Sequence, residues 1–369
     1  MIAALCWAAL VLAAIPAAIG CWNLAVLRTP RPEPSGEEEE VSILIPARDE
    51  AAEIGAALHA ARASRGVRCE IVVMDDGSTD GTAAIVREHA AADRRVRLVA
   101  VPQERAGWVG KNRACQHGAE VARYPTLLFV DADVRLAPNA AASLIAHARR
   151  EGAALVSAVP RQEMRSLGEL LTVPMINLLI LGYLPIARMR STLDPSLGAA
   201  CGQLVLVDAA TYRTLGGHGA VRGHLHEAIH LARHVRRSGY RTDLVAGADL
   251  ATCRMYGSLG ESWAGFAKNA HEGMARPIVL PVWTLLLAGG HVLPFVLILT
   301  GSISAPALGA AALSLVLRLA VTLRTRESLW TVPLHPATVL TGLAIQWTAL
   351  ATRRLGRPVA WKGRLYHAD

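Results

Sequence analysis

The sequence has few aromatic residues and no closely spaced pair of cysteines. Phe, Trp and Tyr make up 5% of the 369 residues, whereas the formal net charge is +8. Proteins that bind nucleic acid through a basic surface commonly add aromatic side chains on which bases stack, so we expect no nucleic-acid partner. None of the six cysteines forms a Cys-x-x-Cys motif. This spacing favours reduced thiols over a disulfide framework.

The N-terminal segment lacks the basic residues that precede the apolar part of a signal peptide. Residues 1–27 are almost uncharged, and the segment exceeds the roughly 20 residues that a membrane-spanning helix needs. The first basic residues, Arg28 and Arg31, come after it. This order predicts an uncleaved anchor with the following domain on the cytoplasmic side. A signal peptide is the weaker alternative.

Apolar residues gather at the two ends of the chain, and most acidic residues lie between them. Three apolar segments follow the central part, at 278–300, 305–323 and 337–351. Three full spans would place the basic C-terminus opposite the central domain, so the positive-inside tendency predicts that 278–300 is re-entrant or interfacial. The predicted parts are an anchor at 1–27, a Pro- and Glu-rich linker at 28–40, a cytosolic domain at 41–276, membrane segments at 277–352 and a basic cytosolic tail at 353–369.

The central part contains four short apolar runs that are typical of strands. They cover residues 41–46, 70–74, 96–101 and 126–130, and alanine-rich stretches that end near residues 64 and 92 follow the first two. Strands that alternate with helices predict a mostly parallel α/β sheet. Such sheets bind ligands at the carboxyl ends of their strands.

Two carboxylates follow the fourth run directly. Because the chain turns at the end of a strand, Asp131 and Asp133 can both reach one hard cation or the phosphate oxygens around it. The competing interpretation is a strand that simply ends in a polar turn.

Three segments in this order resemble the signatures of glycosyltransferase family 2. They are P-A-R-D-E at 46–50, V-V-M-D-D-G-S-T-D-G-T at 72–82 and V-D-A-D at 130–133. The resemblance covers about residues 41–268 and implies an inverting enzyme with the GT-A fold. Within the family, the chain is similar to bacterial membrane-anchored enzymes associated with carotenoid and hopanoid lipids. The residues that carry this similarity are Gly107-Trp108-Val109-Gly110-Lys111, Gly202-Gln203, Gly216-Gly217-His218, Arg254-Met255-Tyr256 and Trp361-Lys362-Gly363-Arg364.

The resemblance implies which residues bind the donor, a nucleotide-diphospho-sugar. Asp133, together with Asp131, would hold Mg²⁺ or Mn²⁺ on the diphosphate. The other implied donor-binding residues are Ala47, Arg48, Glu50, Asp75 and Asp76, with Asp131 under the sugar and ribose. Lys111 stands in a glycine-flanked loop, where backbone can approach phosphate, and is a candidate second countercharge. An ordinary solvated lysine is the alternative.

Other residues point to the acceptor side. Gln203 is expected under the acceptor, and Lys268 is expected near a phosphate or headgroup on an interfacial helix. The Gln-x-x-Arg-Trp motif of processive family members is absent, which disfavours polymer synthesis. The apolar stretch 167–184, interrupted by Pro174, is either interfacial or part of a core.

The expected catalytic base departs from the family pattern. Family members usually carry an acidic pair at the start of a helix that continues Leu-Ala-Arg, and the second acid is taken as the base. Here that second position is Ala228, which leaves Glu227 as the candidate base. His226 or His230 could replace it, since histidine titrates near neutral pH. A catalytically inactive lipid-binding protein is a further alternative.

The same stretch also spells His-Glu-x-x-His, the zinc-peptidase motif. On a helix, His226 and His230 could ligate zinc while Glu227 activates a water, with His224 or His234 as a further ligand. The chain has 13 histidines, so a chance match is the competing explanation.

We therefore expect a multi-pass inner-membrane glycosyltransferase with a cytoplasmic catalytic domain. It would move one sugar from a nucleotide sugar, with a UDP-linked donor favoured, to a lipid acceptor with inversion. A polyprenyl-phosphate sugar synthase is the alternative within the same class, because an anionic phosphate acceptor needs no strong base.

Overall fold

The computed structural model describes residues 1–33, 38–102, 106–355, 359–361 and 364–366. Parts of the predicted linker at 28–40 and of the predicted tail at 353–369 lie outside these residues, as do Lys362 and Gly363 of the C-terminal motif. The chain divides into two compact units. We call residues 27–161 with 186–253 the sheet unit, and residues 1–26 with 162–185 and 254–369 the helical unit.

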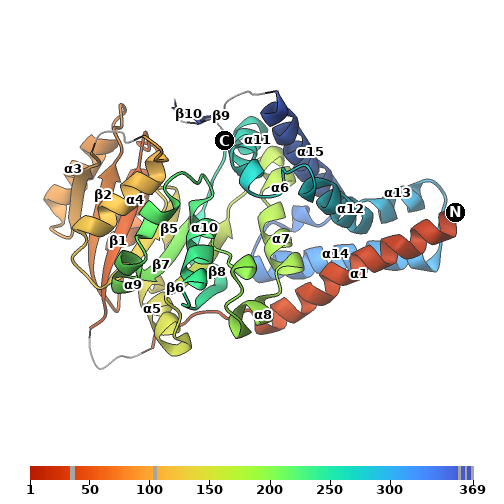
Figure 1. Ribbon diagram of the computed structural model, residues 1–369, viewed down its shortest axis with the longest axis horizontal. Coiled ribbons are helices and arrows are strands. Elements are labelled where there is room, and N and C mark those ends of the chain that lie inside the picture. The colour runs from red at the N-terminus through yellow and green to blue at the C-terminus, as the bar shows by residue number, and fades with distance from the viewer. Residues whose placement is uncertain (34–37, 103–105, 356–358, 362–363, 367–369) are drawn as a thin grey trace. The chain divides into compact units, whose positions relative to one another are not determined.

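The sheet unit is built on one eight-stranded sheet with the order β3-β2-β1-β4-β7-β6-β8-β5 (Figure 1). The first four strands pair in parallel, whereas β7 is antiparallel to both β4 and β6, and β5 is antiparallel to β8. The sheet is therefore mixed, because the strands beyond the predicted parallel set run in both directions. The strands are β1 (Glu40–Ala47), β2 (Arg68–Asp75), β3 (Val96–Ala100), β4 (Thr126–Val130), β5 (Val134–Leu136), β6 (Leu155–Gln162), β7 (Leu204–Asp208) and β8 (Thr242–Cys253).

Seven α-helices and two short 3₁₀ helices among the described residues accompany this sheet. They are α2 (Ile54–Arg62), α3 (Thr82–Ala92), α4 (Gly110–Val121), α5 (Ala140–Glu151), α8 (Ile186–Ser191), α9 (Ala209–Thr214), α10 (Glu227–Arg237), η1 (Pro195–Leu197) and η2 (Gly217–Val221). The four predicted strands are confirmed. The helix after β1 starts at Ile54. In the turn that precedes it, Asp49 adopts a positive φ of 51°, which is incompatible with a right-handed helix.

The core that positions the site lies between the sheet and two of these helices. Apolar side chains of β1, β2, β4 and β7 pack against α4 and α10; the cluster includes Leu127 and Phe129 of β4, Ala114 and Cys115 of α4, and Leu231 and Val235 of α10. Alternate strand residues share a face, so Asp131, two residues beyond Phe129, continues toward α4 and α10. The two helices carry Lys111 and Glu227 at their first turns.

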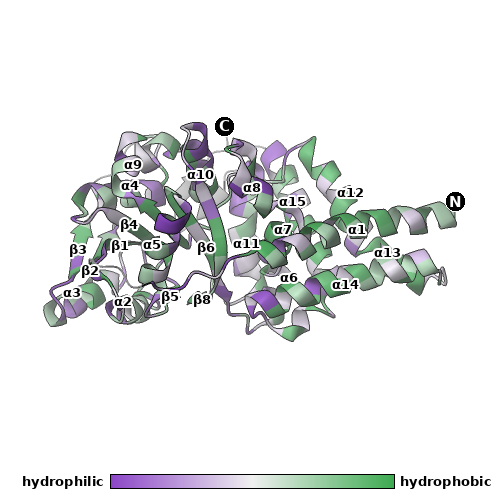
Figure 2. Ribbon diagram, turned by 90° about the horizontal axis from the view of Figure 1, so that it is seen from below, coloured by the Kyte–Doolittle hydropathy of each residue, from purple (hydrophilic) through white to green (hydrophobic). Residues whose placement is uncertain are grey.

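The helical unit contains the apolar segments from both ends of the chain. Its elements are α1 (Ile2–Val26), α6 (Leu167–Thr172), α7 (Met175–Tyr183), α11 (Leu259–Asn269), η3 (Ala270–Glu272), α12 (Val279–His291), α13 (Leu293–Leu299), α14 (Ala305–Thr325), η4 (Leu329–Thr331), α15 (His335–Arg354), β9 (Val359–Trp361) and β10 (Arg364–Tyr366). Helix α1 packs against α14, α12 and α7, and Figure 2 shows α1 as predominantly hydrophobic.

Two described helices, α1 and α14, are long and apolar enough to cross a membrane. The predicted re-entrant segment 278–300 forms α12 and α13, which meet at a bend of 46° and would make a third span if counted together. The bend fits either a broken span or a re-entrant loop, so the topology stays a prediction. The stretch 167–184 forms α6 and α7, which break at Val173 and Pro174.

Candidate active site

The centre of the site is a lysine held between two carboxylates. Lys111, at the start of α4, places its Nζ 2.7 Å from Oδ1 of Asp131 and 2.9 Å from Oε1 of Glu227. Asp131 follows β4 directly, and Glu227 is the first residue of α10. The three residues are thus brought together from three elements that share one core. Lys111 is an ion-paired residue of the site, which rules out the solvated-lysine interpretation.

The ion pairs set the protonation states of this group. Burial alone would lower the pKa of Lys111, but the charges of Asp131 and Glu227 outweigh burial and raise it well above its usual value. Burial also pushes the pKa of Glu227 upward, yet the Lys111 ammonium more than compensates, and the net pKa is lowered. At neutral pH Lys111 is therefore protonated and Glu227 is ionised.

The backbone approaches this group closely at Gly202. The Gly202 carbonyl accepts a hydrogen bond from Lys111 Nζ at 3.4 Å. A Cβ at this position would lie 2.6 Å from Oε1 of Glu227 and 3.1 Å from Nζ of Lys111, so only glycine leaves the pair undisturbed. The backbone carbonyl of the next residue, Gln203, accepts the N–H of Asp131 at 3.2 Å, and the Gln203 side-chain amide donates to Cys253 Sγ at 2.9 Å.

Asp133 has the properties of a cation ligand. Its Oδ1 is buried and has no hydrogen-bond partner among the described residues. Burial, followed by the charge of Asp131, raises the pKa of Asp133 to about 7. A buried carboxylate beside a second carboxylate gains stability from a cation, and carboxylate oxygens are the ligands that Mg²⁺ and Mn²⁺ prefer. Asp131 and Asp133 thus fit the predicted metal.

The predicted nucleotide-binding residues lie on two loops that are joined to each other. The loop after β1 contacts the loop after β2 through backbone N–H groups: Asp49 donates to Ser78 Oγ at 3.0 Å, and Glu50 donates to Thr82 Oγ1 at 2.8 Å. The Ala47 carbonyl accepts the Asp76 N–H at 2.9 Å. Five predicted positions come together at the ends of these two strands and on the loops that follow, namely Ala47, Arg48, Glu50, Asp75 and Asp76.

Asp76 forms an ion pair that the sequence did not predict. Its carboxylate forms a buried ion pair with Arg113 of α4, and its backbone carbonyl accepts a hydrogen bond from Arg48 Nη1 at 2.9 Å. Helix α4 therefore reaches both ends of the site, with Lys111 toward Asp131 and Arg113 toward Asp76. Arg113 lies two residues from Lys111 in an unremarkable polar stretch, and nothing in the sequence singled it out.

A small pocket adjoins the Lys111 group. Asp131, His218, Ala228 and Leu231 are among the residues that line it, with Lys111 and Glu227. His218 follows the Gly216-Gly217 pair, and in the sequence it stood out only as part of the family resemblance. Ala228 faces the same pocket, so the position where the family usually has its second acid leaves no carboxylate there.

The chain is similar to known glycosyltransferases. Residues 42–206 match the family model described as Glycosyl transferase family 2. The chain carries a family 2 glycosyltransferase domain. The match ends after β7 begins, so Asp131 and Asp133 lie inside the matched residues whereas Glu227 lies beyond them.

Relatives of this glycosyltransferase domain extend the comparison. A 4,4'-diaponeurosporenoate glycosyltransferase of Staphylococcus aureus (strain MRSA252) is 29% identical over 258 residues, which cover 68% of this chain and 66% of that protein. The chain thus spans slightly under two thirds of the curated relatives it matches. Among solved structures, a mannosyltransferase from Pyrobaculum calidifontis in complex with GDP-Man and Mn²⁺ has a TM-score of 0.57 at 19% identity, covering 95% of this chain and 99% of that one. These matches confirm the predicted family, enzyme class and GT-A fold.

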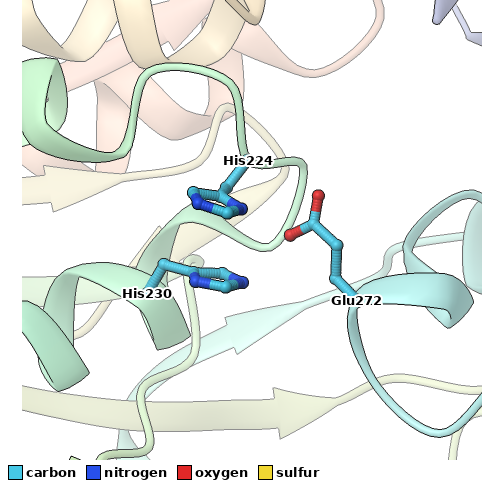
Figure 3. A group of neighbouring side chains, drawn as sticks. All are labelled: His224, His230 and Glu272. Atoms are coloured by element: carbon cyan, nitrogen blue, oxygen red, sulfur yellow. The ribbon is translucent and has the colours of Figure 1, made fainter. Parts of the chain in front are cut away.

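The zinc-peptidase interpretation finds no support in the glycosyltransferase domain. Glu227 is engaged by Lys111. His230 stacks on His224, with ring centroids 3.6 Å apart and an interplanar angle of 9° (Figure 3). Among the described residues, no cluster of three possible metal ligands includes His226 or Glu227. Lys268 belongs to α11 in the helical unit, and its predicted role stays a prediction.

Proposed function

We propose that the protein is a membrane-bound, inverting glycosyltransferase that moves one sugar from a UDP-linked donor to a lipid acceptor. The observation that carries the proposal is the group of Lys111, Asp131 and Glu227 at the carboxyl end of β4, in a family 2 domain. This is the sheet edge where α/β proteins bind nucleotides and their phosphates.

The base and ribose of the nucleotide-sugar donor would bind to the two hydrogen-bonded loops after β1 and β2. Ala47, Arg48 and Glu50 on one loop and Asp75 and Asp76 on the other would surround the base and ribose. Arg113 would fix the Asp76 carboxylate through their buried ion pair, so that Asp76 presents one orientation to the donor.

Asp133 and Asp131 would hold Mg²⁺ or Mn²⁺. The metal would supply positive charge to the diphosphate, which makes it a better leaving group. The orphaned Oδ1 of Asp133 supports this assignment. Lys111 would add a second positive charge, since its ammonium lies at the same end of the sheet as both aspartates.

The acceptor side would comprise Glu227, which the sequence offered as the candidate base and which is paired with Lys111, and Gln203 beneath the acceptor. Lys268 of α11 is the predicted headgroup contact. The two apolar helices, with a third span if α12 and α13 count as one, support a multi-pass membrane protein. The inner membrane and a catalytic domain on its cytoplasmic side are proposed from Arg28 and Arg31, the first basic residues after the N-terminal segment. The S. aureus relative, named for 4,4'-diaponeurosporenoate, supports a lipid acceptor that offers a carboxyl or hydroxyl group.

A polyprenyl-phosphate acceptor is the second candidate. Ala228 in the pocket and the pairing of Glu227 with Lys111 favour it, because a phosphate acceptor is already anionic and needs no strong base. The two candidates differ in the chemical class of the acceptor and can be separated directly.

The test is transfer by the purified full-length protein in detergent with Mn²⁺. Donors would be UDP-glucose, UDP-N-acetylglucosamine and GDP-mannose, and acceptors would be retinoic acid, phytanol and undecaprenyl phosphate. We expect product with a UDP-sugar and with retinoic acid or phytanol. Product with undecaprenyl phosphate alone would establish the second candidate. Failure with every pair, under conditions in which the protein binds UDP, would contradict transferase activity.

A further inference from the structure

The pocket beside Lys111 has few groups that can take up a proton. Asp131 and Glu227 both face the Lys111 ammonium. Cys115 also lines the pocket, but burial raises the pKa of its thiol, so it stays protonated. Among the described lining residues, His218 is the remaining titratable group, and no ion pair is formed by its ring.

The ring of His218 is fixed from one side. Nδ1 lies 2.7 Å from the hydroxyl of Tyr212, and that hydroxyl also accepts the backbone N–H of His218 at 3.0 Å. The imidazole packs edge-on against Phe129, with ring centroids 4.9 Å apart. His218 is 4% exposed. Its other nitrogen, Nε2, has no hydrogen-bond partner among the described residues, while the side chain lines the pocket.

The hydrogen-bond network allows Nε2 to act as an acceptor. The Tyr212 hydroxyl lies 3.3 Å from Oε1 of Gln116, and Gln116 Oε1 also accepts the Gly219 N–H at 3.0 Å. When Tyr212 donates to Gln116, its oxygen is free to accept the Nδ1–H of His218. The neutral ring then carries its lone pair on Nε2.

We propose that, when the acceptor offers a hydroxyl group, His218 is the proton acceptor of the transfer reaction, with Nε2 taking the hydroxyl proton; this rests on the proposed function. An acceptor oxygen lone pair forms the bond to the anomeric carbon of the donor. The bond from that carbon to the diphosphate oxygen breaks, and its electron pair leaves on the diphosphate. The acceptor's O–H proton moves to Nε2, so charge and atoms balance.

Burial and the neighbouring charges set the protonation state of His218 before the reaction. Burial lowers its pKa to about 4, an effect that Glu227 opposes and Lys111 strengthens. The ring is therefore neutral throughout the physiological pH range, and its Nε2 lone pair is unprotonated before the reaction. If the donor's diphosphate draws the Lys111 ammonium toward itself, the pKa-lowering influence on His218 weakens. Glu227 would then face the newly formed imidazolium and stabilise it.

The experiment uses the full-length protein with phytanol as the hydroxyl acceptor and whichever donor the wild type turns over, because a carboxylate or a phosphate is already ionised at neutral pH. A wild type that uses retinoic acid or undecaprenyl phosphate but not phytanol would overturn the assignment of His218. His218→Asn keeps a polar group near Tyr212 but removes Nε2, and His218→Gly opens room for free imidazole. His59→Asn is the matched control, because His59 is an exposed histidine of α2 and is not among the residues that line the pocket.

We expect His218→Asn to bind UDP with Mn²⁺ as the wild type does, but to lose about 100-fold or more in kcat. His59→Asn should keep the kcat of the wild type. Free imidazole should restore part of the activity of His218→Gly, and should restore none to Glu227→Gln. A purely structural role for His218 would not produce rescue by imidazole.

With phytanol as acceptor, two further results would overturn the assignment. One is a kcat of His218→Asn close to that of the wild type, and the other is a His218→Gly protein that binds UDP yet gains nothing from imidazole. Absence of transfer by the wild type with every donor and acceptor would instead overturn the proposed function, and the assignment of His218 with it.

Discussion

Gly202 shows how one missing side chain allows the charged group to form. The end of Glu227 and the end of Lys111 occupy the space next to where a Cβ would lie. Both are flexible side chains, so we expect Gly202→Ala to fold while its methyl group displaces the ion pair. Activity should fall by about tenfold or more, with little change in Tm.

Gly55→Ala is the matched control for this substitution. Its Cβ would meet Ile85 Cγ2 at 3.5 Å, an ordinary contact, and Gly55 lies in α2, where alanine is favoured over glycine. Steady-state kinetics and thermal unfolding of both variants separate an effect on activity from an effect on stability. Full activity in Gly202→Ala would show that catalysis does not depend on the position of the Lys111–Glu227 ion pair.

His218 also predicts a dependence of stability on pH. Its pKa is about 4 in the folded protein, against an ordinary value of 6.5. Between these values the unfolded chain binds more protons than the folded one, so stability rises with pH across this window. The contribution is present above about pH 6.5 and is lost as the pH falls toward 4. We expect the Tm of the wild type to fall more steeply than that of His218→Asn between about pH 6.5 and 4.5; parallel curves would contradict the low pKa.

At the scale of elements, hydrogen bonds connect α4 to the segment that precedes α10. The Asn112 side-chain amide lies within 2.9 to 3.1 Å of the backbone carbonyls of Val221, Arg222 and His224, and the side chain is fully buried. These hydrogen bonds fix α4, which carries Lys111, to the residues just before Glu227.

Removing the amide should loosen this connection. We expect Asn112→Ala to lower stability by about 1–3 kcal/mol, since buried carbonyls lose their donor, and to lower kcat more than it raises the KM for the donor. Chemical unfolding and steady-state kinetics measure the two effects. An unchanged kcat would show that the position of Lys111 does not depend on the hydrogen bonds of Asn112.

The sequence predicted those elements whose signals are local. Strand-length apolar runs and the acidic ends of β2 and β4 are visible in the chain, and so are the apolar segments that became α1 and α14. The ion pairs of Lys111 were not predictable, because Lys111, Asp131 and Glu227 meet only after α4 and α10 pack on the same face of the sheet. Arg113 was missed for the same reason, and His218 was noted only as part of the family resemblance, without a place in the site. The antiparallel half of the sheet was missed because its strands carry no distinctive motif.

At the scale of the whole molecule, the apolar helices predict how the protein fractionates. We expect the full-length chain to stay in the membrane pellet after extraction with alkaline carbonate, because α1 and α14 are 25 and 21 residues long and apolar enough to span. Spanning helices resist this treatment, whereas peripheral proteins are released. Recovery in the supernatant would contradict membrane insertion.

The most direct test of the central claim is metal-dependent sugar transfer by wild type, Asp133→Asn and Asp249→Asn. Asp249 is an exposed aspartate in β8 and serves as the control for loss of a carboxylate. We expect the wild type and Asp249→Asn to release UDP and form product with Mn²⁺, and Asp133→Asn to lose both activities. Equal turnover by Asp133→Asn, or turnover that persists after removal of divalent metal, would contradict the account.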